Sequence, residues 1–570
     1  MPSLTPTIVQ LVLINETGDS YYRMRFPGAE LALQRPSWRI INLDAAAAER
    51  FEWAREADLL VLYQCADLDL IPLLRERIHA GKKTLVEYND NFYEFPEWGP
   101  VAKQWSSPLL WQSYETFMHE ADGVIVTGPG LADLFGANVP KEKLHILKNH
   151  LPNEPEPLNV LRPAPEAEVS IGWGGSLGHM ADFLAIVPTI EEVLRAKPNA
   201  HLRVMGNSSI PSFLHIPSEQ LHFTEWGTLK QYYEFWRPVQ IGIAPLLDTA
   251  YNRCRSDIKA VEMAGMGVLP LLPDALPYRE FLEKTGLTPF HNAAELRQIL
   301  IHYIENPAAL RNDLERAHAY VREERLGPRR TERAQLYEAL LPQNLSAYAW
   351  PVACGYHEVK GTPPSTSPTK ELLNKAQQLI NQKKLSEARA LLENKIAEFP
   401  ANPDVLLALL KCLLAEGSSD YNTRLDLALS QFPKDLRFSL FKLNSTRSAL
   451  LRSDLWHEVL RKVEDLPVSA REFYVHDLQR ALANQLRIDP SASSIAESLV
   501  ALFPLNAGLR LIHAEALVQQ GRDSEALPHF LWLERTHDKI TQNKEFPEQV
   551  KHGYLKAWIE TLQARIKGAC

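Results

Sequence analysis

The chain contains few cysteines, and none of them belongs to a metal or disulfide motif. The five cysteines among its 570 residues are Cys65, Cys254, Cys354, Cys412 and Cys570. Their number is odd, they lie far apart and no C-x-x-C pair occurs, which argues against both a disulfide framework and a zinc site. A reducing compartment is therefore the simple expectation.

The chain also lacks long apolar runs and an excess of positive charge. No stretch reaches ~18 consecutive apolar residues, the length that a membrane-spanning helix needs. The first apolar run, at 8–14, is short and strand-like, and no basic segment precedes it. A net charge of −9 gives no electrostatic footprint for nucleic acid or for an anionic membrane surface. We expect a cytoplasmic protein with no transmembrane segment and no nucleic-acid partner.

Short β-rich runs alternate with amphipathic helical stretches over most of the first two thirds of the chain. Strands are expected at 7–14, 38–43, 58–63, 84–88, 123–127 and 143–147 and, after a proline-rich break at 151–165, at 169–173, 201–205, 221–223, 239–244 and 268–272. Such alternation is typical of parallel sheets covered by helices on both faces. The expected fold class is α/β, with two Rossmann-like, doubly wound lobes at 1–160 and 161–345. The carboxyl ends of their strands would face a common cleft.

A linker and a helical array are expected to follow the lobes. The sequence GTPPSTSPT at 361–369 closes a predicted linker at 346–369. Beyond it, prolines recur at Pro400, Pro433, Pro467 and Pro504, at spacings of 33, 34 and 37 residues, and small residues precede the turns at Ala388, Ala492 and Ala526. A period near 34 favours an all-α array of tetratricopeptide-like helical hairpins over 370–570, with an irregular helical bundle as the alternative. Such arrays bind partner proteins or other copies of themselves.

The segment at 241–270 carries the strongest chemical pattern. It reads IGIAPLLDTAYNRCRSDIKAVEMAGMGVLP, which predicts a buried strand, a polar loop and a helix that begins near Ser256. Ser256 and Asp257 are candidate N-caps of that helix. The basic residues around its N-terminus are Arg253, Arg255 and Lys259. A helix N-terminus beside cations at the end of a strand is suited to binding a diphosphate.

Lys259 and Glu262 are three residues apart and share one face of this predicted helix. The lysine can reach phosphate oxygens, and the carboxylate can accept hydrogen bonds from ribose hydroxyls. The alternative is a solvated i,i+3 pair that binds no ligand.

A glycine-rich loop forms the second pattern. The segment at 171–182 reads IGWGGSLGHMAD, in which glycines such as Gly174 and Gly175 allow backbone N–H groups to approach phosphate closely. It is not the G-x-G-x-x-G dinucleotide motif, and no clear ribose-binding acid follows it. A nicotinamide-dependent dehydrogenase is therefore not favoured.

At these segments the chain resembles the retaining, two-lobed (GT-B type) glycosyltransferases of the large group 1 family. SDIKAVEMAGMGVLP resembles their nucleotide-sugar helix, and IAPLLD resembles the strand and loop before it. The resemblance extends over roughly 8–341. It implies hexosyl transfer, with retention, from a nucleotide-diphosphate sugar to a glycan or protein acceptor in surface polysaccharide assembly or protein glycosylation. It also implies that the sugar nucleotide is a co-substrate and that no metal or other cofactor is required.

The resemblance assigns roles to individual residues. The implied catalytic residues are Lys259, Arg255 and Asp90, the last as a partner of the acceptor hydroxyl or, alternatively, as a capping residue. The implied donor-binding residues are Gly174, Gly175, His179, Asn207, Trp226, Arg253, Ser256, Asp257 and Glu262, with Trp226 in the loop that holds the nucleotide base. The implied acceptor-side residues are Gly18, Tyr22, Arg23 and Arg25. The alternative for these four is a solvated loop with one structural salt bridge.

One position departs from the family pattern. Many members carry two glutamates eight residues apart, of which Glu262 matches the second, but Cys254 occupies the first position. Asp248 and Asp257 are the candidate substitutes. The departure favours a rival hypothesis, in which inactive lobes serve as a scaffold for repeats that bind a partner protein. A two-lobed nucleotide-sugar epimerase is a third possibility.

Overall fold

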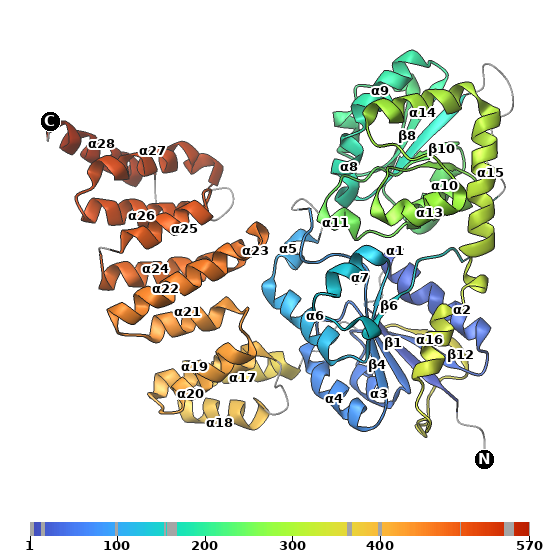
Figure 1. The fold of residues 1–570 in the computed structure, drawn as a ribbon. Coiled ribbons are helices and arrows are strands. Elements are labelled where there is room, and N and C mark those ends of the chain that lie inside the picture. The colour runs from blue at the N-terminus through green and yellow to red at the C-terminus, as the bar shows by residue number, and fades with distance from the viewer. Residues whose placement is uncertain are drawn as a thin grey trace. The chain divides into compact units, whose positions relative to one another are not determined.

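The structure is a computed structural model. It describes residues 5–12, 18–96, 101–152, 156, 168–361, 368–396, 402–490, 492–540 and 552–568. The chain divides into two compact units (Figure 1). The first unit comprises Met1–Trp105 and Ser113–Pro368, and the second comprises Ser106–Gln112 and Thr369–Cys570.

The first unit contains two parallel sheets, as the alternation of apolar runs and helices predicts. The seven-stranded sheet has the order β12-β2-β1-β3-β4-β5-β6, and the five-stranded sheet has the order β11-β10-β7-β8-β9. Helices lie on either side of each sheet (Figure 1). The two Rossmann-like lobes are confirmed.

All eleven predicted strands are present, and their described ends differ from the prediction by at most two residues. In the first lobe they are β1 (Thr7–Val12), β2 (Arg39–Asp44), β3 (Leu59–Tyr63), β4 (Lys83–Tyr88), β5 (Gly123–Val126) and β6 (Leu144–Ile146). In the second lobe they are β7 (Val169–Gly174), β8 (Ala200–Gly206), β9 (Leu221–Glu225), β10 (Ile241–Ile243) and β11 (Leu269–Leu271). Most of the predicted proline-rich break lies outside the described residues.

Helices connect these strands along the chain, and residues 108–112 of one of them, α6, belong to the second unit. In the first lobe they are α1 (Gly18–Ser20), the π-helix η1 (Tyr21–Arg25), α2 (Phe26–Gln34), α3 (Arg50–Glu56), η2 (Leu68–Leu70), α4 (Ile71–His79), α5 (Ala102–Trp105), α6 (Pro108–Glu120), α7 (Pro129–Phe135) and η3 (Lys141–Lys143). In the second lobe they are η4 (Leu177–His179), α8 (Met180–Leu184), α9 (Val187–Ala196), η5 (Ile210–Phe213), η6 (Ser218–Gln220), α10 (Leu229–Trp236), α11 (Ala250–Arg253), α12 (Ile258–Gly265), η7 (Leu276–Tyr278), α13 (Arg279–Thr285), α14 (Ala293–Glu305) and α15 (Pro307–Glu324).

After α15 the chain returns to the first lobe. The sequence analysis did not predict this return, because it assigned 161–345 to the second lobe and 346–369 to a linker. After η8 (Gly327–Arg329), helix α16 (Glu332–Leu340) places Ala334 and Tyr337 in the core of the first sheet. Within the predicted linker, β12 (Gly355–Val359) pairs in parallel with β2 and extends that sheet. The strand was missed because it is short and only half-buried, between segments of linker composition.

The second unit is helical, and Figure 1 shows its helices in successive pairs. They are α17 (Pro368–Asn381), α18 (Leu385–Ile396), α19 (Pro403–Glu416), α20 (Tyr421–Gln431), α21 (Leu436–Ser445), α22 (Ala449–Glu464), α23 (Val468–Arg471), η9 (Glu472–Tyr474), α24 (Val475–Ile488), α25 (Ser493–Leu502), α26 (Ala507–Gln519), α27 (Asp523–Ile540) and α28 (His552–Gly568). Ala388 and Ala526 are fully buried within α18 and α27. Ala492 instead precedes α25, where Ala496 takes the buried position, and Pro400 lies outside the described residues.

Two further expectations concern the whole chain. Among the helices that the structure describes, none combines the length and the apolar character that crossing a membrane would require. Of the cysteines, Cys65, Cys254, Cys354 and Cys412 are free thiols, and Cys570 lies outside the described residues.

Candidate functional site

Helix α12 carries the predicted diphosphate-binding residues at its N-terminus. Of the two candidates, Asp257 is the N-cap residue of the helix, although its side chain makes no capping hydrogen bond. The Asp257 carboxylate instead accepts hydrogen bonds from both Nη atoms of Arg325, at 2.5 and 2.8 Å. Arg325 is buried, and its planar fork fits a carboxylate better than a single backbone N–H does. Ser256 Oγ accepts a hydrogen bond from Asn149 at 3.2 Å.

Lys259 and Glu262 lie on one face of α12, as predicted, but they do not form a solvated pair. Lys259 Nζ donates to the carbonyl oxygen of Gly174, the last residue of β7, at 2.6 Å. Glu262 is only 4% exposed, and its carboxylate accepts hydrogen bonds from Tyr22 at 2.6 Å and from Tyr232 at 3.2 Å. Burial lowers the pKa of Lys259 to about 8 and raises the pKa of Glu262 above its ordinary value.

Arg255 and Asp90 join the two lobes. Arg255 Nη1 donates to Asp90 Oδ1 at 3.1 Å, its guanidinium lies 4.3 Å from the ring centroid of Tyr251, and its buried Nε has no hydrogen-bond partner. The other Asp90 oxygen accepts a bond from Asn89 at 2.9 Å. Burial raises the pKa of Asp90 to about 7, because it outweighs the opposing effect of Arg255. Asp90, which follows β4, therefore faces the donor lobe through an ion pair.

The glycine-rich loop follows β7 at the carboxyl edge of the donor-lobe sheet. A Cβ atom on Gly174 would lie 2.9 Å from the Tyr232 ring, and one on Gly175 would lie 2.6 Å from the Trp173 ring, so close packing requires both glycines. His179 lies 3.4 Å from Asp182, and burial lowers its pKa, which favours a neutral imidazole. Asp182 accepts bonds from the backbone of Leu247 and from the side chain of Asn252, at 2.9 and 2.7 Å.

Two further donor-side residues end neighbouring strands. Asn207 follows β8 and accepts a hydrogen bond from the Ser209 backbone at 3.0 Å. Trp226 follows β9, and it is 49% exposed although it is a large aromatic side chain. An exposed ring at this edge of the sheet can stack on a nucleotide base.

The loop between β10 and α12 contains an exposed ion pair. Arg253 donates two hydrogen bonds to Asp248, at 2.8 and 3.0 Å. Asp257, the other candidate substitute for the missing glutamate, is bound by Arg325. Cys254 is buried, which raises the pKa of its thiol to about 11, so it presents no negative charge.

The predicted acceptor-side loop is a helix. From Gly18 the chain runs through α1, η1 and α2 to Gln34 without a break. A Cβ atom on Gly18 would meet nothing within 4 Å, so close packing does not explain this glycine. Arg25 pairs with Glu358 of β12 at 2.7 Å.

Arg23 is buried rather than solvated. Its guanidinium donates to Glu87 of β4 at 2.6 Å and to Asn149 at 2.7 Å, and Arg333 of α16 binds the same carboxylate at 2.8 Å. Glu87 lies 64 residues after Arg23 and 246 residues before Arg333 in the sequence. Because these contacts are so distant along the chain, the local sequence pattern could not show that Arg23 is engaged within the protein.

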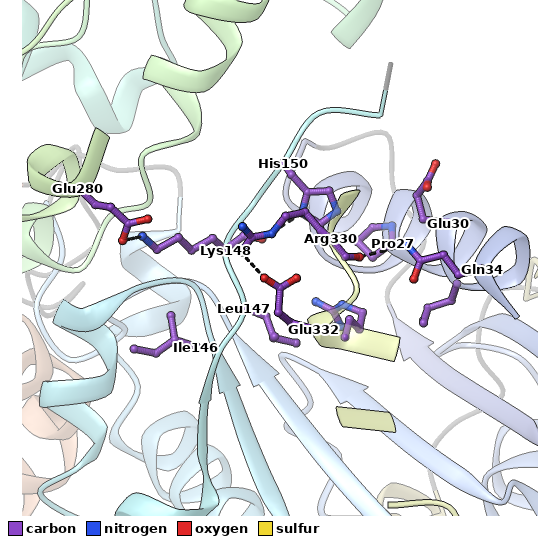
Figure 2. Close-up of a pocket in the computed structure, with 12 residues that line it drawn as sticks. Pro27, Glu30, Gln34, Ile146, Leu147, Lys148, His150, Glu280, Arg330 and Glu332 are labelled. Carbon is purple, nitrogen blue, oxygen red and sulfur yellow. Dashed lines mark hydrogen bonds and ion pairs between the residues drawn. The ribbon is translucent and has the colours of Figure 1, made fainter. Parts of the chain in front are cut away.

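Two cavities in the first unit meet at one ion pair. The smaller, of about 190 Å³, is lined by Arg255, Ser256 and Asp257 and by Thr127, Gly128 and Pro129 of the first lobe. The larger, of about 250 Å³, is shown in Figure 2 and contains none of the predicted site residues. Both are lined by Lys148 and Glu280, which form an ion pair (Figure 2). Lys148 lies two residues after β6 and places a further cation at these cavities. The sequence analysis did not name Lys148, although a cation directly after a strand is a signal for such a position.

A metal centre was not expected for this site. Within the residues that the structure describes, no group of three His, Cys, Asp or Glu side chains is arranged to hold a metal ion.

No protein-family model and no curated protein sequence matches the chain. Among solved structures it is similar to Anabaena HepE in complex with UDP, at 12% identity over 59% of this chain and 99% of HepE (TM-score 0.41). It is similar to an O-GlcNAc transferase of Thermobaculum terrenum, at 16% identity over 60% of this chain and 68% of the other (TM-score 0.39). It spans about half of TarM, at 12% identity over 50% of this chain and 55% of TarM (TM-score 0.38). At TM-scores below 0.5, these likenesses assign neither an activity nor a site to this chain.

Proposed function

We propose that the chain is a glycosyltransferase, which moves a sugar from a nucleotide-diphosphate donor to a hydroxyl of a glycan or protein acceptor. The observation that carries this proposal is the pairing of Lys259 and Glu262 on one face of α12. Lys259 reaches the end of β7, so a cation and a hydroxyl-binding carboxylate lie together at the carboxyl edge of the donor-lobe sheet. Ligands of open α/β sheets bind at that edge. The exposed Trp226, at the end of β9, supplies a surface for the base.

The chemistry would depend on stabilising the leaving group. As the bond between the sugar C1 and the diphosphate oxygen breaks, negative charge grows on the phosphate, and Lys259 with Arg255 would stabilise that charge through preorganised electrostatics. The acceptor oxygen would form the new bond to C1 on the same face, and its proton would pass to the departing phosphate oxygen. Asp90 would orient the acceptor hydroxyl from the opposite lobe. In this mechanism no metal is required, so activity should survive chelation by EDTA.

The pH dependence of kcat/KM should report Asp90 and Lys259. Asp90, with a pKa raised to about 7, is a much stronger hydrogen-bond acceptor when it is ionised, so activity should rise as the pH increases through about 7. Lys259, with a pKa lowered to about 8, attracts phosphate only when protonated, so activity should fall as the pH increases through about 8. A narrow bell-shaped profile is expected. Asp90→Asn should remove the acidic limb and Lys259→Arg the alkaline limb, whereas a profile unchanged by both substitutions would contradict these assignments.

A second candidate function rests on Cys254. This residue is buried and neutral, and the two candidate substitutes for the first glutamate of the family pattern, Asp248 and Asp257, both pair with arginines. This favours a scaffold whose lobes have lost activity and whose helical hairpins bind a partner protein or a second copy of the chain. Under either function we propose that the hairpins of the second unit supply this protein contact.

Nucleotide binding distinguishes the two functions. Isothermal titration of the full chain with UDP, GDP, ADP and their glucose conjugates should give saturable binding of one nucleotide if the transferase proposal is correct. Incubation of that sugar nucleotide with candidate acceptors should then yield a glycosylated product with the donor's anomeric configuration. Product from the donor alone would favour the epimerase. Binding of none of these probes would favour the scaffold.

A further inference from the structure

The carboxylate that the proposed function assigns to ribose is buried, and each of its oxygens accepts a hydrogen bond from a tyrosine hydroxyl. Tyr22 donates to Glu262 Oε1 at 2.6 Å, and Tyr232 donates to Oε2 at 3.2 Å. The Tyr22 hydroxyl also bonds to that of Tyr233. Each carboxylate oxygen thus accepts one O–H donor, which is the pattern that a pair of neighbouring ribose hydroxyls would provide.

Tyr22 and Tyr232 reach Glu262 from different parts of the first unit. Tyr232 lies on α10, in the same lobe as Glu262, and its ring packs against Trp236. Tyr22 belongs to the helix that follows β1 in the other lobe, yet it packs into the hydrophobic core of the donor lobe and is only 6% exposed. The contact between Tyr22 and Glu262 spans 240 residues of sequence. Of the two donors, Tyr22 is therefore the one that a movement between the lobes can withdraw.

The backbone at Tyr22 is itself unusual. Residues Tyr21–Arg25 form a π-helix, the only one among the described residues, between the α-helical turns of α1 and α2. Isolated π-turns within α-helices are less stable than the α-helix around them and are frequent at functional positions. The helix thus departs from regular geometry at the residue that contacts Glu262.

We propose that Tyr22 is a specificity-determining residue of the donor site, whose hydroxyl takes the place of a ribose hydroxyl on Glu262 and must be displaced when a ribonucleotide binds. This inference rests on the proposed function, because it requires Glu262 to bind ribose. It moves Tyr22 from the acceptor side, where the family resemblance puts it, to the donor side. Return of the π-turn to α-helical geometry is a route by which Tyr22 leaves without unfolding of the helix.

The test compares ribonucleoside diphosphates with their 2′,3′-dideoxy forms, by calorimetric titration of the full chain. Only the ribose form needs Glu262, so only its binding requires Tyr22 to leave. In the wild type, the hydrogen bonds that the ribose hydroxyls form with Glu262 are offset by the loss of the bond from Tyr22. The ribonucleoside diphosphate and its dideoxy form should therefore bind with affinities within about threefold of each other, for UDP, GDP or ADP. Tyr22→Phe should strengthen ribonucleotide binding roughly tenfold or more, the worth of one hydrogen bond to a charged group, and leave dideoxynucleotide binding unchanged.

Tyr233→Phe is the matched control, because Tyr233 bonds to the Tyr22 hydroxyl, whereas the hydroxyls that donate to Glu262 are those of Tyr22 and Tyr232. It should leave the ratio of ribonucleotide to dideoxynucleotide affinity within about threefold of the wild type. Weaker or unchanged ribonucleotide binding in Tyr22→Phe overturns the role of Tyr22 while the donor site stands. A wild-type preference for ribose above about tenfold overturns it without any variant. If neither wild type nor Tyr22→Phe binds any of the three ribonucleotides, the donor site and this inference fail together.

Discussion

Lys259→Ala is expected to lower kcat for sugar transfer roughly 10²–10³-fold, the usual cost of removing one preorganised donor to developing negative charge. The lysine lies beside the carbonyl oxygen of Gly174 at the end of β7, and burial holds it in a partly desolvated position where its charge acts strongly. The measurement is the turnover of the sugar nucleotide identified by titration, together with the affinity for the matching nucleoside diphosphate. Both should fall if, as proposed, Lys259 contacts the phosphates before and during transfer.

Lys230→Ala supplies the control for this experiment. Lys230 lies on α10 of the same lobe, its side chain is 86% exposed and it pairs only weakly with Glu234, at 3.9 Å. Its loss should change turnover by less than about twofold, as for most exposed ion pairs. Equal effects of the two substitutions would contradict a specific role for Lys259. Partial recovery of activity in Lys259→Arg at a pH above about 8 would support the requirement for a cation at this position.

The sequence predicts elements better than it predicts the contacts between them. Each predicted strand is a short apolar run bounded by turn residues, so its local pattern is enough to predict it. Strand β12 was not predicted, because Gly355–Val359 is half-buried and lies within a segment of linker composition. The shared face of Lys259 and Glu262 likewise follows from helical spacing alone.

What the residues bind could not be predicted from local spacing. The Arg255–Asp90 pair and the Tyr22–Glu262 bond join positions 165 and 240 residues apart. Arg253 and Arg255 look equivalent in sequence, yet one pairs with Asp248 on the surface and the other with Asp90 between the lobes. Local spacing therefore does not show which carboxylate each of these two cations contacts.

Glu87→Gln is expected to reduce the free energy of unfolding of the first unit by about 3–5 kcal/mol, the usual effect of removing one partner from a buried ion pair. Glu87 is fully buried between Arg23 of η1 and Arg333 of α16, at 2.6 and 2.8 Å. Without its charge, two buried guanidiniums lose the anion that compensates them. The loss should appear as a lower midpoint of the first-unit transition in calorimetry, and Glu338→Gln, which removes an exposed partner of Arg35, should cost less than about 1 kcal/mol.

The ion pairs of Glu87 also predict how the difference in the free energy of unfolding between wild type and Glu87→Gln depends on pH. Burial by itself raises the pKa of Glu87, but Arg23 and Arg333 together outweigh it and hold the pKa below the ordinary value of 4.5. A carboxylate with a depressed pKa contributes its stability above the unfolded-state pKa and loses it as the pH falls through the folded-state value. The difference in the free energy of unfolding between wild type and Glu87→Gln should therefore be complete at neutral pH and should close as the pH falls below 4.5. A difference that persists unchanged in strong acid would mean that the variant loses packing rather than the charge that compensates Arg23 and Arg333.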